Sequence, residues 1–283
     1  MIMTDTTGAF ASFEQKWLAA HPENRVIAVF LPAAQRRRAN AFGTLVHELE
    51  QAAFRVREPQ VAAAKLEWWQ RELHEAALGK ANHPITQILF AADDAVHEVD
   101  PAVWPALADG ALEQLDQPGS GTLSALIEQL EPFYTAVARA ESALLGVAGA
   151  NLEADAALWT FAHLLHELPQ LAQTEGRLPV PLGLLARHEV TRADLAVPSP
   201  RRNMLVKDFL DEVVLETNGA LGVAAARTLA SRVRTTLDRM RIEHALRVTD
   251  PLAWLQAHPH AGRWKTLIAV WREARNKPLT SNS

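Results

Sequence analysis

The sequence predicts an all-α protein, and three observations support that class. Ala, Leu, Glu, Gln and Arg, which favour helices, dominate its 283 residues. Runs of alternating β-branched residues that close in Asn-Gly or Asp-Gly turns, which are typical of hairpins, are missing. Apolar residues recur instead at steps of three and four over long stretches, which is the period of an amphipathic helix.

The first clear helix is expected over residues 33–57, where the apolar residues form one stripe. Pro59 should end it, because proline disfavours a helical residue before it. The next helix is expected over 61–78, with Gly79 as its C-terminal cap. A shorter helix that begins at a proline is expected over 85–92.

The clearest linker of the chain, Gln-Pro-Gly-Ser-Gly, occupies residues 117–121. A helix over 126–145 should follow, and Pro132 either kinks it or splits it into two. Asp155 is expected to cap the next helix. The last helices are expected over 202–215, 219–247 and 262–276.

A single all-α domain over residues 1–283 is the economical interpretation of these elements. No internal repeat stands out, and the 117–121 linker is too short to separate independent domains. Residues 1–23 and 277–283 are expected to be flexible ends.

Composition and charge narrow the possible partners. A net charge of −5 argues against a nucleic-acid-binding protein, and the absence of cysteine excludes disulfides and cysteine metal sites. No segment contains the roughly 20 apolar residues that span a bilayer. The N-terminus lacks the features of a secretory signal, so we expect a cytoplasmic protein, with peripheral membrane contact left open.

Three blocks, at residues 31–51, at Trp68-Trp69 and at residues 175–181, together resemble the squalene/phytoene synthase family, and the resemblance extends over roughly residues 24–275. Residues 31–51 resemble its first metal-binding helix, the Trp68-Trp69 block its tryptophan-rich helix, and residues 175–181 the segment after its second metal-binding helix. Within the family, the pattern is nearer to the branch that contains the mitochondrial respiratory complex I assembly factor and its bacterial relatives. This resemblance implies an isoprenoid-synthase-like helical bundle around a central cavity.

The resemblance also implies that the metal ligands of the family are lost. In the family each metal-binding helix offers two aspartates four residues apart, which hold magnesium against a diphosphate. A gapless match puts His47 and Gln51 at the first pair of positions. It puts Leu168 and Ala172 at the second pair. Magnesium prefers oxygen ligands in octahedral geometry, so no metal or cofactor is predicted.

Some residues remain candidates for chemistry or binding. A shift of one residue would bring Glu48 or Glu167 toward the cavity, and Arg177 could bind an anion, so these three would serve an active enzyme. Possible ligand contacts are Arg38, Trp68, His163 and Arg177. His163 and His166 could together hold a transition metal, but a polar cavity wall explains them more simply.

Three functions follow from these observations. The preferred one is a non-catalytic factor that binds an apolar, isoprenoid-like ligand or assists the assembly of a protein partner. The alternative is an active prenyltransferase with remodelled ligands, which would need magnesium. The third is a structural partner without a small ligand, and it predicts a cavity filled by side chains.

Overall fold

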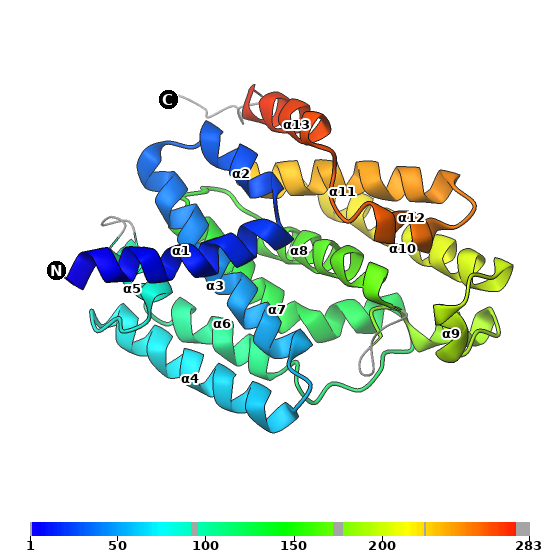
Figure 1. Ribbon diagram of the computed structural model, residues 1–283, viewed down its shortest axis with the longest axis horizontal. Helices are drawn as coiled ribbons and strands as arrows, with labels where there is room; N and C mark the ends of the chain where they lie inside the picture. The colour runs from blue at the N-terminus through cyan, green and yellow to red at the C-terminus, as the bar shows by residue number, and fades with distance from the viewer. Residues whose placement is uncertain (1, 92–95, 172–177, 224, 276–283) are drawn as a thin grey trace.

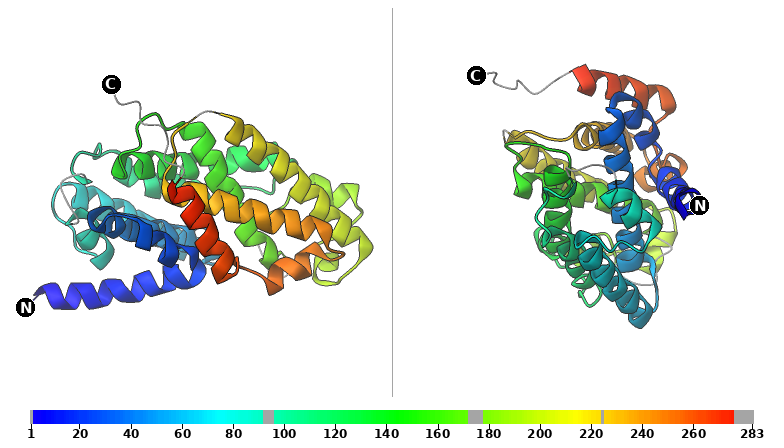
Figure 2. Two further views of the ribbon diagram at one scale, coloured as in Figure 1. Left: turned by 90° about the horizontal axis from the view of Figure 1, so that it is seen from above. Right: turned by 90° about the vertical axis from the view of Figure 1, so that its left-hand side faces the viewer.

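The protein is a bundle of helices in a computed structural model, which describes residues 2–91, 96–171, 178–223 and 225–275 (Figure 1). Within these ranges the chain forms helices and no strand, which confirms the predicted all-α class. Two further views show α1 along one side of the bundle and α13 on its outer surface (Figure 2).

The helices follow the expected order, and most of their bounds lie within a few residues of the predicted ones. The longer ones are α1 Ile2–Ala20, α3 Ala33–Arg55, α4 Pro59–Ala77, α6 Val103–Leu112, α7 Leu123–Leu144, α8 Leu152–Glu167, α10 Pro200–Gly222, α11 Leu229–Arg247 and α13 Arg263–Arg275. The short ones are α2 Glu23–Ile27, α5 Pro84–Phe90, α9 Leu182–Arg187 and α12 Pro251–Ala257, with 3-10 turns η1 Ala28–Phe30, η3 Leu168–Gln170 and η4 Ala193–Ala196.

The N-terminal segment, expected as a flexible end, forms helix α1, and its Phe10 and Trp17 side chains are buried. Trp17 packs over Gly43 of α3, where a Cβ atom would lie 2.3 Å from the indole ring. A residue larger than glycine at position 43 would therefore displace α1 from α3. Residues 277–283 lie outside the described part of the chain.

Helix α7 continues through Pro132 as one helix. The proline therefore does not split this segment into two helices. Pro132 is exposed, and so is Glu128, the residue whose carbonyl group a proline at position 132 deprives of its backbone hydrogen bond. Gly110 of α6 lies against this point, because its Cβ position is only 2.7 Å from the Cα atom of Phe133. The missing side chain allows α6 and α7 to approach closely.

Two expected helix ends were wrong. Asn151, not Asp155, caps α8, because its side chain accepts a hydrogen bond from the backbone N–H of Ala154. The expected break near residues 215–219 is also misplaced, because α10 runs to Gly222 and α11 begins only at Leu229. The guanidinium of Arg227 donates to carbonyl groups at the end of α10 and so satisfies acceptors that a helix end leaves free.

The apolar side chains form one large core and one smaller cluster. The large core includes residues of α3, α4, α6, α7 and α8, among them Leu45, Trp69, Leu107, Phe133 and Leu164. The smaller cluster joins α2, α11 and α13 through Ile27, Val233, Leu237, Ala269 and Val270. None of the described helices is both long and apolar enough to cross a membrane.

Candidate functional site

A cavity of about 300 Å³ lies between α3, α8 and α11, and the connection from α1 to α2 and the segment before α13 close it. The lining residues recur along each helix at the spacing of one helical face, as expected for helices that surround a common space. The cavity has apolar walls as well as charged groups. The apolar side chains include Trp17, Phe42, Val46, Phe54, Trp159 and Leu237.

The first wall comes from α3, which carries the first family motif. Gly43, His47, Gln51 and Phe54 follow one another at steps of four and three and face the cavity. Glu50 lies on the same face, and its Oε1 atom accepts a hydrogen bond of 3.0 Å from the hydroxyl group of Tyr134. Both degenerate positions on α3 therefore line the cavity.

The second wall comes from α8, which faces the cavity through Trp159, His163, His166 and Glu167. We call α3 and α8 the motif helices. Burial raises the pKa of Glu167 to about 7, although the nearby guanidinium of Arg55 acts in the opposite direction. The ring of His163 packs on that of Phe54, with centroids 4.3 Å apart. Of the predicted ligand contacts, His163 is thus the one that the described cavity wall contains.

The imidazole of His21 lies between the two motif helices. Its ring centroid is 5.8 Å from that of His47 and 5.2 Å from that of His166. Burial acts to lower the pKa of His21, but the hydrogen bond and negative charge of Glu23 together with the charge of Glu50 outweigh burial, and the pKa is raised. Burial lowers the pKa of His47 to about 4 and that of His166 to about 3, and the charge of His21 acts in the same direction. At neutral pH the two motif histidines are therefore neutral.

Each of the five carboxylates that line the described part of the cavity already contacts a donor or a cation. Their partners come from several helices, so the acids are tied into the cavity walls rather than grouped. The pairs are Glu23 with His21, Glu50 with Tyr134, Glu141 with Trp159, Glu167 with Arg55, and Asp238 with Arg241.

The other predicted candidates lie elsewhere. Glu48 is buried on another face of α3, pairs with Lys65 at 3.3 Å and is not among the cavity-lining residues described. Trp68 is half exposed and packs on Trp69, away from the cavity wall. Arg38 also falls outside the described lining.

The second pair of degenerate positions is not at the cavity wall either. Leu168 is fully buried in the large core and does not line the described cavity. Ala172 and Arg177 lie outside the described residues. The cavity-facing residues of α8 lie immediately before the positions that the gapless match selected.

A short repeat in the sequence would have identified the second wall. His47-Glu48-Leu49-Glu50-Gln51 and His166-Glu167-Leu168-Pro169-Gln170 share the pattern His-Glu-Leu-x-Gln. Both histidines line the cavity, one from each motif helix. The position on α8 that corresponds to His47 is therefore His166, two residues before Leu168. His21 and Glu50 were also missed, because nothing in the sequence alone indicates that His21 meets α3.

Magnesium does not suit the groups at the motif positions. It needs hard oxygen ligands in octahedral geometry, and His47 and Gln51 offer an imidazole nitrogen and a neutral amide. On α8, Glu167 supplies one carboxylate, and Arg55 occupies one of its oxygens at 2.6 Å. The prediction that the protein uses no magnesium stays a prediction, and the donor set agrees with it.

A helical bundle whose cavity lies between two motif helices is the isoprenoid-synthase type of fold. A family model described as squalene/phytoene synthase matches residues 20–253, and the chain belongs to this family. No curated protein matches the chain.

Two solved structures share this fold over nearly the whole chain. A dehydrosqualene synthase in complex with ligand has a TM-score of 0.67 and 13% identity, over 96% of this chain and 97% of that chain. The squalene synthase HpnC from Alicyclobacillus acidocaldarius has a TM-score of 0.57 and 15% identity, over 96% and 97%. At these identities the likeness establishes the fold alone.

Proposed function

We propose that this protein is a non-catalytic member of its family that holds an isoprenoid or another amphipathic lipid in the central cavity. The observation that carries the proposal is the state of the cavity acids. Each of the five in the described lining has a partner within the protein, and the motif positions on α3 hold His47 and Gln51. Ionisation of an allylic diphosphate in this family depends on magnesium to offset the charge on the leaving group, and these groups are poorly suited to hold magnesium.

The walls of the cavity support a ligand with an apolar chain and a polar end. Phe42, Val46 and Phe54 offer apolar surface along α3. Arg234 of α11 lies over the ring of Trp159 at 3.5 Å and brings a positive charge to the same space. A volume of about 300 Å³ is at the small end of the range for ligand pockets. The volume also argues against the purely structural role, which predicts a filled cavity.

Binding of a fluorescent farnesol analogue to the purified protein tests this proposal. Wild-type protein should bind it, and Ala162→Trp should abolish binding, because Ala162 lines the cavity and an indole would fill it. Ala64→Trp is the matched control, since Ala64 is exposed on α4 and its replacement should leave the affinity unchanged.

Two outcomes would contradict the lipid-binding role. One is that wild-type protein does not bind the analogue, and the other is that Ala162→Trp binds it as well as Ala64→Trp does. The assembly-factor role, which needs a protein partner rather than a lipid, would then be the one to test. The active-enzyme alternative would depend on Glu167, since Glu48 points away from the cavity wall and pairs with Lys65.

A further inference from the structure

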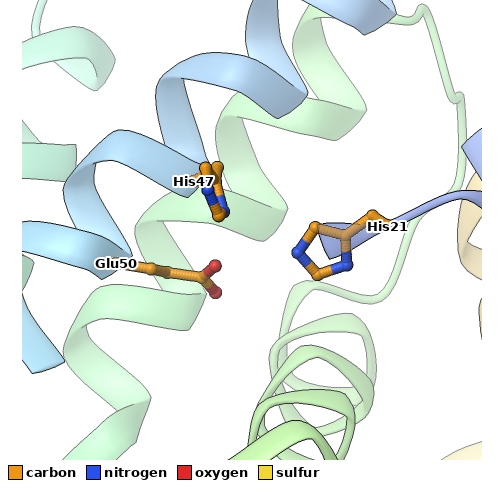
Figure 3. Close-up of side chains that lie close together, drawn as sticks. All are labelled: His21, His47 and Glu50. Atoms are coloured by element: carbon orange, nitrogen blue, oxygen red, sulfur yellow. The ribbon is translucent and has the colours of Figure 1, made fainter. Parts of the chain in front are cut away.

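Three side chains that line the cavity converge on one point, and the proposed binding of a lipid does not account for this arrangement. His47 and Glu50 come from α3, and His21 comes from the connection between α1 and α2. Their ligand atoms all lie within 4.8 Å of one another. Figure 3 shows the three side chains pointing toward a common space, with one ring nitrogen of His21 turned toward the other two. We propose that His21, His47 and Glu50 bind a divalent transition metal ion, with zinc as the representative.

The donor types suit such an ion. Imidazole nitrogen and a single carboxylate oxygen are the ligands of many zinc sites with three protein ligands, which leave a position for water or another ligand. In a tetrahedral site with bonds of about 2.0–2.2 Å, the ligand atoms lie about 3.4 Å apart. The three atoms would therefore close by little more than 1 Å, which small side-chain rotations can supply.

Two further residues orient these ligands by contacting the atoms that would not bind the metal. Nδ1 of His21 lies 3.7 Å from a carboxylate oxygen of Glu23, an arrangement that leaves Nε2 for the metal. The hydroxyl group of Tyr134 donates to Oε1 of Glu50 at 3.0 Å and leaves Oε2 for the metal. Carboxylates behind ligating histidines and hydrogen bonds to ligating carboxylates are regular features of metal sites.

The proposed site differs from the magnesium sites of the family in its chemistry. Magnesium takes oxygen ligands and keeps several waters, whereas two imidazoles favour ions such as Zn²⁺, Co²⁺ and Ni²⁺. Metal binding here does not depend on a lipid in the cavity. If the protein does not bind lipid, the metal-site proposal is unaffected. If it does not bind a metal ion, the lipid-binding proposal is unaffected.

Titration calorimetry of the metal-stripped 283-residue chain with Zn²⁺ tests the site. Wild-type protein should bind one ion per chain, and Mg²⁺ should give no comparable binding. His21→Gln and Glu50→Gln should each weaken Zn²⁺ binding by more than about 100-fold, since even residues behind the ligands contribute 10–100-fold. His163→Gln is the matched control, because it removes a histidine of the same cavity outside the cluster.

A second measurement needs no variant and so does not depend on how the variants fold. Co²⁺ added to wild-type protein should give the intense visible absorption of a four-coordinate site, and an equimolar amount of Zn²⁺ should abolish it. The proposal is overturned if Co²⁺ gives only the weak spectrum of the hydrated ion. It is equally overturned if folded His21→Gln binds Zn²⁺ as tightly as His163→Gln does.

A second surface, on the opposite side of α13 from the bundle, carries an independent inference. The exposed residues Trp264, Leu267, Ile268 and Trp271 lie at steps of three, one and three and form one apolar stripe. Trp264 leaves 78% of its surface exposed, which is exceptional for an indole. The other side of α13 packs on the bundle through Thr266, Ala269 and Val270.

The positive charge around this apolar stripe indicates which kind of surface would bind it. The exposed charges of α13 are all positive, although the chain as a whole has a net charge of −5. Arg275 packs over the ring of Trp271 at 4.2 Å, so a cation and an indole lie side by side. The acid of the helix, Glu273, accepts a hydrogen bond from Thr236 of α11 on the inner side. The basic residues are Arg263, Lys265, Arg272 and Arg275. From this pattern we infer that α13 docks on an anionic lipid surface.

Sedimentation with lipid vesicles tests this second inference. Wild-type protein should bind vesicles that contain phosphatidylglycerol, and should bind pure phosphatidylcholine vesicles much more weakly. The double variant Trp264→Ser/Trp271→Ser should lose at least about tenfold in affinity for the anionic vesicles, because indole side chains anchor proteins at the lipid interface. Met204→Ser/Leu215→Ser, which changes two exposed apolar residues of α10, should bind as wild type does.

The vesicle experiment has two contradicting outcomes. Equal binding to both kinds of vesicle would exclude recognition of anionic lipid. Self-association in sedimentation velocity that the tryptophan double variant abolishes would assign the stripe to a contact between two copies of the chain instead.

Discussion

Arg55 of α3 and Glu167 of α8 form an ion pair at the edge of the cavity, with Nη2 of Arg55 2.6 Å from Oε1 of Glu167. The pair joins the two motif helices. The ion pair also occupies the carboxylate of Glu167, which is the acidic group that α8 presents to the cavity. The same guanidinium donates to Gln170 of the 3-10 turn η3, so three polar groups join α3 to α8 and to the turn that follows it.

Removal of this ion pair should destabilise the protein. Arg55→Met should lower the free energy of unfolding at pH 8 by about 1.5–3 kcal/mol, because a hydrogen bond to a charged group is lost from a largely buried carboxylate. Urea denaturation measures this change. Arg187→Met, which removes an exposed ion pair with Glu212, should cost less than about 1 kcal/mol. Equal costs for the two variants would contradict a structural role for the Arg55 pair.

Glu167 should also make stability depend on pH. Its pKa is about 7 in the folded protein and near 4.5 when unfolded, so the folded state keeps a proton that the unfolded state has released. This titration alone should therefore lower the free energy of unfolding by at most about 3 kcal/mol as the pH rises from about 4.5 to about 7, whereas the lowered pKa values of His47 and His166 act in the opposite direction below about pH 6.5. Urea denaturation across this range should show that the difference in free energy of unfolding between wild type and Glu167→Gln falls as the pH rises, whereas the difference between wild type and Glu212→Gln, at a partly exposed residue, should stay constant. Parallel profiles for wild type and Glu167→Gln would refute this assignment.

The close approach of α6 and α7 should not tolerate a side chain at Gly110. A Cβ atom there would lie 2.7 Å from the Cα atom of Phe133 and 2.9 Å from the carbonyl oxygen of Pro132, and both are backbone atoms. Gly110→Ala should therefore lower the free energy of unfolding by about 1–3 kcal/mol. Gly219→Ala in α10 meets no atom within 4 Å and should stabilise the protein by about 0.5–1 kcal/mol. Thermal unfolding measures both changes, and the same sign for both would be inconsistent with this packing.

The sequence predicted much of the fold because local patterns determine it. The apolar stripe before Pro59 places the end of the first long helix at 57, and α3 ends at Arg55. Pro59 and Pro84 each open a helix, as their missing N–H group favours. Helix α1 was missed because its apolar positions, Phe10, Phe13 and Trp17, lie among threonine, glycine and alanine.

The site was harder to predict because it depends on which residues of distant segments meet. The sequence correctly placed His47 and Gln51 on a cavity-facing helix, since their spacing of four residues survives in α3. It could not show that His21 reaches them, because that contact depends on how the connection after α1 folds over α3. For the second motif the gapless match selected Leu168, which lies in the core, instead of His166, which lies in the cavity wall.

Whether the protein is non-catalytic is tested most directly by the release of pyrophosphate from farnesyl diphosphate by purified protein in the presence of Mg²⁺. Because the cavity acids are engaged and the motif positions on α3 hold His47 and Gln51, the non-catalytic role predicts no release above a protein-free control. Magnesium-dependent release that Glu167→Gln abolishes would contradict it and would make this chain a working prenyltransferase.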